Sequence, residues 1–126
     1  MSQRALVVED DPVVRKLEEA LLRQAGYEVD LAADGKTALE SLSAGKYDVV
    51  VLDFELPDID GIEIVARLRA LPGHRTTPLV MVTGTKDLGA RRRGFEAGVA
   101  VFMAKPFTAE MFRSIIATAT HGPGTR

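Results

Sequence analysis

A short apolar run that ends in a carboxylate constrains this chain more than any other feature. The run Val49–Leu52 contains three valines and a leucine, it leads directly into Asp53, and a turn rich in Pro, Asp and Gly follows over residues 57–61. Continuous apolar runs of this kind are typical of strands buried on both faces of a parallel sheet covered by helices. Ligands of such sheets bind at the carboxyl ends of the strands. Asp53 is therefore expected to lie at a ligand-binding edge.

Other polar side chains also stand at the ends of apolar runs. Glu9 and Asp10 follow one run, Thr83 follows a second and Lys105 follows a third. Because the carboxyl ends of parallel strands meet at one edge of the sheet, these residues are expected to lie near Asp53. This convergence is the main indication of a functional site.

Short apolar runs alternate with helical patterns along the whole chain. The expected strands are residues 5–8, 27–31, 47–52, 79–82 and 99–102. The expected helices run from Pro12 to Gly26, from Gly35 to Gly45, from Gly61 to Pro72, from Lys86 to Glu96, and onward from Thr108. This alternation predicts a single α/β domain with a doubly wound, five-stranded parallel sheet. Right-handed crossovers would bring all the strand ends to one edge.

Local signals support several helix boundaries. Asp11 is expected to cap the first helix, with Pro12 at its first position, and Thr108 is expected to cap the last. Glycines weaken the helix over residues 86–96, so it is expected to rearrange most readily. The apolar side chains of the last helix are expected to point inward: Met111, Phe112, Ile115, Ile116 and Ala119.

Composition excludes several classes of function. The net charge of −2 provides no general basic field for direct nucleic-acid binding. No run approaches the roughly 18 apolar residues of a membrane span, and we expect the first residues to lead into a strand and not to form a signal peptide. Cysteine is absent, which fits a reducing, cytoplasmic setting. Residues 1–120 are expected to form the domain, and residues 121–126 have the composition of a flexible tail or linker.

Three carboxylates are expected to share one shallow site: Glu9, Asp10 and Asp53. Like charges this close raise one another's pKa, and a hard divalent cation relieves the repulsion. Mg²⁺ takes oxygen ligands and typically uses one or two carboxylates together with substrate phosphate. Glu9 and Asp10 are not needed to cap the first helix, because Asp11 already occupies that position. We therefore interpret the acids as a magnesium site.

A hydroxyl and an ammonium group complete the expected site. Thr83 and Lys105 would donate hydrogen bonds to phosphoryl oxygens, and Asp53 would be the nucleophile. Each of the two donors also has an ordinary interpretation, Thr83 as a turn residue and Lys105 as a solvated loop lysine. Together with three acids, they indicate a site that accepts a dianionic phosphoryl group.

Six short motifs occur in an order and at spacings typical of one family. They are VVED at 7–10, VLD at 51–53, LPDIDG at 56–61, VTG at 82–84, GFEAG at 94–98 and KPF at 105–107. From about Arg4 to Thr120 the chain resembles the receiver domain of two-component response regulators. The resemblance implies a flavodoxin-like (βα)5 fold.

The resemblance also implies a function. Asp53 would accept a phosphoryl group from the histidine of a sensor kinase or phosphotransfer protein, and an altered surface would then meet a downstream protein. Such a domain catalyses only its own phosphorylation and dephosphorylation, so it is not an enzyme with a separate substrate. The implied roles are Mg²⁺ ligation by Glu9, Asp10, Asp53 and the Glu55 backbone carbonyl, switching by Thr83 and Phe102, and phosphate binding by Lys105. A cis peptide bond is implied between Lys105 and Pro106.

Two other functions are considered from the residues. Asp53 and Glu55 imitate the acid–spacer–acid motif of aspartyl-phosphate hydrolases of the haloacid dehalogenase type, but that class places its motif after the first strand. A receiver-like module that binds partners without phosphorylation is the second alternative, and retention of all the site residues argues against it. Phe102 is interpreted equally well as a core aromatic. Arg91, Arg92 and Arg93 are interpreted as a solvated helix face in preference to a partner-binding patch.

Overall fold

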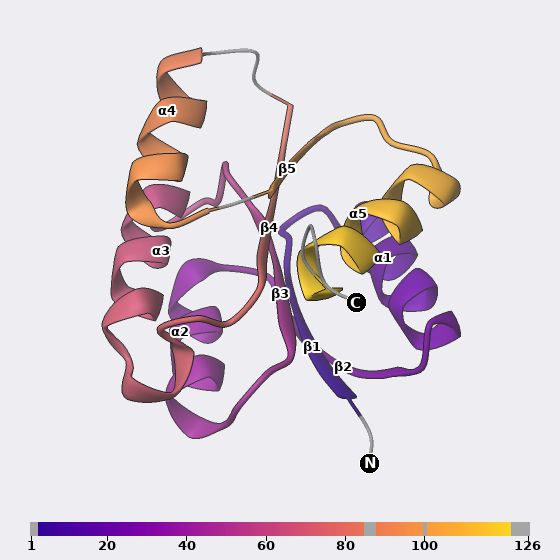
Figure 1. Cartoon of the computed structure of the whole chain (residues 1–126), viewed down its shortest axis with the longest axis horizontal. Coiled ribbons are helices and arrows are strands. Elements are labelled where there is room, and N and C mark those ends of the chain that lie inside the picture. The colour runs from indigo at the N-terminus through magenta and orange to yellow at the C-terminus, as the bar shows by residue number, and fades with distance from the viewer. Residues whose placement is uncertain (1–2, 85–87, 100, 122–126) are drawn as a thin grey trace.

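Five parallel strands and five α-helices alternate along the described chain, which comprises residues 3–84, 88–99 and 101–121 of the computed structural model (Figure 1). The strands are β1 (Gln3–Val8), β2 (Tyr27–Ala32), β3 (Val49–Asp53), β4 (Leu79–Thr83) and β5 (Val101–Ala104). The helices are α1 (Pro12–Gln24), α2 (Gly35–Ala44), α3 (Gly61–Ala70), α4 (Leu88–Ala97) and α5 (Ala109–His121), with a 3₁₀ turn η1 at Pro72–His74. The strand order is β2-β1-β3-β4-β5, which confirms the predicted doubly wound α/β sheet.

Helices cover both faces of the sheet. Figure 1 shows α1 and α5 on one side and α2, α3 and α4 on the other. Side chains of β3 alternate between the two apolar layers: Val50 and Leu52 join one core cluster, and Val49 and Val51 join the other. Every residue of β3 is buried, as the continuous apolar run predicts for a central strand.

The polar residues at helix starts act as caps. The Asp11 carboxylate accepts hydrogen bonds from the backbone N–H groups of Val13 and Val14, and it begins α1 as predicted. The Thr108 hydroxyl accepts a hydrogen bond from Met111 N–H (3.0 Å), which begins α5. These caps fix where the chain turns after a strand, and therefore which residues remain in the loops at the carboxyl edge.

The loop after Asp53 is fastened to a neighbouring helix. The Asp58 carboxylate accepts hydrogen bonds from Gly35 N–H (2.8 Å) and Lys36 N–H (3.0 Å) at the start of α2, and the bond from Gly35 is the main reason that the pKa of Asp58 is lowered. Gly61 lies so close to the backbone of Phe54 that a Cβ there would stand 2.7 Å from the Phe54 carbonyl oxygen. The loop therefore has little freedom beside the end of β3.

Some sequence expectations were wrong in detail. β3 begins at Val49 rather than at residue 47, and β5 spans Val101–Ala104 rather than residues 99–102. Met111 is 46% exposed and does not point inward, because the buried face of α5 is centred on Phe112 and Ile116, one helical turn apart. The start of the helix expected at Lys86 lies outside the described residues. None of the described helices is long and apolar enough to cross a membrane.

Candidate functional site

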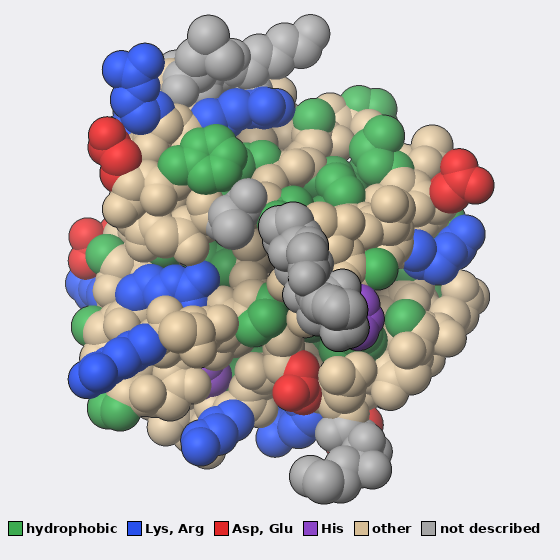
Figure 2. Space-filling model, viewed as in Figure 1, with side chains coloured by type: hydrophobic (Ala, Val, Ile, Leu, Met, Phe, Trp, Pro, Cys, Tyr) green, Lys and Arg blue, Asp and Glu red, His purple; other side chains and the backbone are tan. Residues whose placement is uncertain are grey.

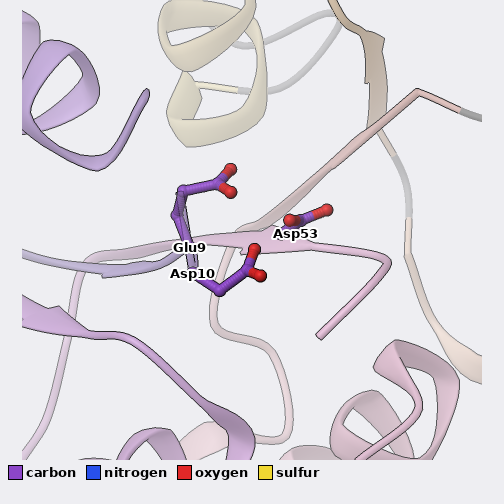
Figure 3. A group of neighbouring side chains, drawn as sticks. All are labelled: Glu9, Asp10 and Asp53. Carbon is purple, nitrogen blue, oxygen red and sulfur yellow. The ribbon is translucent and has the colours of Figure 1, made fainter. Parts of the chain in front are cut away.

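The carboxyl ends of β1 and β3 bring three acidic side chains together. Glu9 and Asp10 directly follow β1, and Asp53 is the last residue of β3. One carboxylate oxygen from each of the three lies within 4.8 Å of the others. Figure 3 shows the three side chains gathered at this edge of the sheet. The structure therefore produces the acidic cluster that the sequence predicts.

Lys105 supplies positive charge to this cluster from the loop after β5. Its Nζ lies 2.9 Å from Glu9 Oε1 and 3.3 Å from Asp53 Oδ2. Burial works against the ammonium charge, but the hydrogen bond to Glu9 and the charge of Asp53 outweigh it and raise the pKa of Lys105. The Lys105 N–H donates to the Thr83 carbonyl (2.9 Å), so the loop continues the pairing of β4 and β5. The peptide bond between Lys105 and Pro106 is cis, as the resemblance implies.

Glu9 is a buried acid in spite of its position in a loop. Its side chain is 1% exposed, and Oε2 accepts a hydrogen bond from Asp11 N–H (3.2 Å). Burial raises the pKa of Glu9 to about 7, the hydrogen bond from Lys105 opposes that rise, and the neighbouring Asp53 adds to it. Arg15 donates to the Glu9 carbonyl oxygen (2.9 Å) and so holds the loop in place. Glu9 thus sits in an environment that favours a nearby positive charge.

The chain as a whole matches a known protein family. A family model described as the response regulator receiver domain matches residues 5–117 of the chain. The chain belongs to this family. The receiver domain is 40% identical over 121 residues to the transcriptional regulatory protein TcrA of Mycobacterium tuberculosis, a match that covers 95% of this chain and 47% of TcrA. The receiver domain therefore spans about half the length of the curated relatives that it matches.

Solved structures of receiver domains have the same fold. The receiver domain of the sensor histidine kinase PA1611 of Pseudomonas aeruginosa has a TM-score of 0.86 and 34% identity, with 95% of this chain and 98% of that one covered. Its description records a magnesium ion coordinated in the active site cleft. The chemotaxis response regulator CheY4 of Vibrio cholerae has a TM-score of 0.90 and 28% identity, with coverages of 94% and 99%.

The acidic cluster of this receiver domain fits a hard divalent cation. It offers carboxylate oxygens from Glu9, Asp10 and Asp53, which are the ligand type that Mg²⁺ prefers. Asp10 is exposed, so the cluster is open to solvent on one side, whereas Glu9 and Asp53 are buried. Among the described residues, Lys105 is paired with both buried carboxylates, and the three acids together carry an excess of negative charge that a cation would balance.

The other expected site residues surround the end of β3. Thr83 ends β4 and is 1% exposed. Phe102 lies in β5 opposite Met81 and packs against one of the two core clusters. Glu55 is exposed, and its backbone N–H donates to Asp53 Oδ1 (3.1 Å). The acid–spacer–acid motif of Asp53 and Glu55 thus begins at the end of the third strand. Hydrolases of the haloacid dehalogenase type carry this motif after the first strand, so its position argues against that alternative. The family assignment argues against it as well.

The sequence analysis missed one acidic residue of this region. Glu18 of α1 is 1% exposed, and among the described residues neither of its side-chain oxygens has a hydrogen-bond partner. Burial raises the pKa of Glu18 to about 8, the charges of Glu9 and Asp53 add to that rise, and the charge of Lys105 opposes it. The helical period indicates that Glu18 faces the core, because it stands four residues before the buried Leu22 and so lies on the same side of α1.

Proposed function

We propose that this receiver domain accepts a phosphoryl group on Asp53 from the phosphohistidine of a sensor kinase or phosphotransfer protein. The observation that carries the proposal is the environment of the Asp53 carboxylate. It is buried at the end of the central strand, one oxygen accepts a backbone hydrogen bond from Glu55, and the other is paired with Lys105. Both carboxylate oxygens are therefore held in place before any donor arrives.

The contacts of this carboxylate support a phosphoryl-transfer step. An oxygen of Asp53 attacks phosphorus and forms an acyl phosphate, while the P–N bond of the donor breaks and its electron pair returns to the imidazole, which takes up a proton. Lys105, now beside Asp53, donates to a phosphoryl oxygen. Glu9, Asp10, Asp53 and the Glu55 carbonyl would hold Mg²⁺, which offsets the negative charge of the acids and of the phosphoryl group.

Thr83 and Phe102 are proposed to report the phosphorylation. Thr83 and Met81 point to the same face of β4, and Phe102 is paired with Met81 on the adjacent strand. A hydrogen bond from the Thr83 hydroxyl to the phosphoryl group would draw the end of β4 toward the site. That movement would change the packing around Phe102 and so the surface presented to a downstream protein. The domain turns over no separate substrate in this scheme.

The donor protein needs a surface beside the site on which to bind. Apolar side chains line a groove next to Lys105, with Val14 and Leu17 on α1 and Pro106 and Phe107 after β5. Val13, which precedes Val14 in α1, is 76% exposed. We propose that the phosphohistidine protein docks here, because a donor bound over this groove would lie within reach of Asp53.

Labelling with a small donor tests the proposal. Acetyl phosphate with Mg²⁺ should phosphorylate the wild-type protein, whereas Asp53→Asn should remain folded and unlabelled because an amide cannot form the acyl phosphate. Glu28→Gln, which removes an exposed carboxylate on β2, is the matched control and should be labelled normally. Labelling of Asp53→Asn at the wild-type rate would contradict the assignment. A wild-type protein that stays unlabelled would favour the phosphorylation-independent alternative. The cytoplasmic location stays a prediction from composition.

A further inference from the structure

Two contacts of helix α4 with the rest of the domain differ in kind. We propose that α4 is held by an aromatic latch at Gly94 and by an arginine clamp at Gly98, and that phosphorylation opens the latch while the clamp stays closed. The helix would then turn about its C-terminal end. The release step rests on the proposed function, whereas the two holding contacts stand on the geometry of the protein.

The latch is the ring of Phe102 lodged in a notch of α4. A Cβ built at Gly94 would stand 2.4 Å from Phe102 Cζ, closer than side chains pack, so the ring occupies space that only a glycine leaves free. The Phe95 ring meets the Phe102 ring edge to face, with the centroids 4.9 Å apart. The guanidinium of Arg91 lies 6.0 Å from the Phe102 centroid. Three residues of one helix therefore seat a side chain of β5.

Figure 2 gives one view of the surface, on which apolar and basic side chains gather close to each other in the region occupied by α4 in Figure 1. Phe95 is 56% exposed, so the ring that flanks the latch also forms part of the surface. A movement of Phe102 out of the notch would remove the partner of Phe95 and change this surface directly. The latch thus links the core side of β5 to the solvent side of α4.

The clamp is the side chain of Arg69, which comes from α3. Its Nη1 donates to the carbonyl oxygens of His74 (3.1 Å) and Thr77 (2.7 Å), and its Nη2 donates to the carbonyl oxygen of Gly98 (3.1 Å). Gly98 has a φ of +111° and follows the last residue of α4. A cation at the C-terminal end of a helix also interacts favourably with the helix dipole. Arg69 therefore fastens this end of α4 to the segment that leads into β4.

The anchor on the other side of the clamp is itself rigid. The His74 ring is 1% exposed, its Nδ1 lies 2.9 Å from Thr77 Oγ1, and its Nε2 lies 3.1 Å from the Leu42 carbonyl oxygen. The clamp thus combines three charge-assisted hydrogen bonds with two anchoring residues, His74 and Thr77, that are themselves buried. The latch has only ring contacts, which lack directional bonds. When the two are strained together, the latch should open first.

The positions of the two contacts define the motion. Thr77 precedes β4 and Gly98 precedes β5, so the clamp lies at the amino edge of the sheet, opposite the phosphorylation site. Phe102 lies within β5, two residues before the position paired with Thr83. A displacement of Thr83 therefore reaches the latch through one strand pair and leaves the clamp at the far edge undisturbed.

The latch is tested by filling the notch. Gly94→Ala should shift the ring resonances of Phe102 in NMR spectra of the resting protein, because the added methyl group excludes the ring. Gly89→Ala, at an exposed position in the first turn of the same helix, is the control and should leave those resonances unchanged. Gly94→Ala should also speed amide exchange in α4, because the helix loses its contact with the ring, and the double variant Gly94→Ala with Phe102→Leu should return the exchange rates of α4 to near wild type. Unshifted Phe102 resonances in Gly94→Ala would overturn the latch.

The clamp is tested by amide hydrogen exchange. The amides of Gly98 and Val99 bond to the carbonyls of Phe95 and Gly94 at the end of α4. Arg69→Gln should speed their exchange by about fivefold or more, the effect expected when at least one hydrogen bond is lost. Arg67→Gln on the same helix, which breaks only an exposed pair with Glu63, is the control and should leave them unchanged. Equal exchange in Arg69→Gln and wild type would overturn the clamp.

Beryllofluoride with Mg²⁺, a phosphoryl mimic, tests the motion itself. In the wild type it should shift the Phe102 resonances while Gly98 and Val99 keep their protection, and in Arg69→Gln those two amides should lose protection as well. Loss of protection at Gly98 in the wild type would overturn the pivot. A wild type that does not bind beryllofluoride would contradict the proposed function, and the resting-state measurements would still decide whether the latch and the clamp hold α4.

Discussion

Replacement of Glu18 by glutamine should stabilise the protein, and the gain should grow with pH. The Glu18 carboxyl is 1% exposed and its oxygens have no hydrogen-bond partner among the described residues. Burial raises its pKa from 4.5 to about 8. Below pH 4.5 the group is protonated in both the folded and the unfolded chain, so it has no pH-dependent effect on stability. As the pH rises, the unfolded chain releases the proton first, and the folded state loses stability until the pH passes the folded pKa.

The size of the effect follows from the two pKa values. Each unit of pH between 4.5 and 8 should cost the folded state about 1.4 kcal/mol, which amounts to about 3 kcal/mol at pH 7 and to about 5 kcal/mol above pH 8. Glutamine has almost the same shape and cannot ionise. The difference in unfolding free energy between Glu18→Gln and wild type should therefore be smallest near pH 4.5 and largest above pH 8.

Urea denaturation at a series of pH values is the assay. Groups that do not interact with Glu18 titrate alike in both proteins, so their contributions cancel in the difference between mutant and wild type. Glu19→Gln is the neighbouring control: it breaks a partly exposed pair with Arg23 and should give a small, nearly constant difference. A Glu18→Gln difference that stays constant between pH 5 and pH 8 would refute the argument that the buried carboxyl holds its proton.

Three further predictions concern the site. Asp10→Ala should weaken Mg²⁺ binding, measured by titration, far more than Asp11→Ala, which removes only a helix cap worth about 1 kcal/mol; equal losses would show that the acid pair is misassigned. Lys105→Gln should slow labelling by acetyl phosphate by about tenfold or more, because a donor to the phosphoryl oxygens is lost, and an unchanged rate would contradict that role. Glu55→Gln should speed labelling a few-fold, with a gain that shrinks as salt rises, because one exposed charge near the mouth of the site interacts by only about 1 kcal/mol and is screened over about 8 Å. Lys105 pairs with Glu9, so it is not expected to offset the charge of Glu55. A Glu55→Gln mutant that is labelled more slowly than wild type at low salt would contradict the repulsion argument.

Periodicity and capping in the sequence were sufficient to predict the sheet and most of its helices. The run Val49–Leu52 is a central strand, and Asp11 and Thr108 begin helices, because these features depend on residues close together in the chain. The acidic cluster could also be predicted, since the ends of parallel strands must meet at one edge of the sheet. The starts of β3 and β5 lie two residues later than expected, because the pairing with neighbouring strands determines where a strand begins.

The features that the sequence did not reveal depend on long-range contacts. Glu18 occupies an inward position of α1, and its charge suggested solvent, so only the packed structure shows that it is buried. Arg69 reads as an ordinary basic residue of an exposed helix end, although its guanidinium contacts the Gly98 carbonyl 29 positions further along the chain. Gly94 looked like a weak point in a helix, whereas it leaves room for the ring of Phe102.

Mapping the phosphorylated residue tests the central claim most directly. The protein would be incubated with acetyl phosphate and Mg²⁺, the acyl phosphate trapped by reduction, and the modified residue located by peptide mass spectrometry. The structure predicts one Mg²⁺-dependent modification at Asp53, the buried carboxylate held by Lys105 and the Glu55 amide. Modification at Asp10 or Glu9 instead, or label that forms equally well without Mg²⁺, would contradict the account.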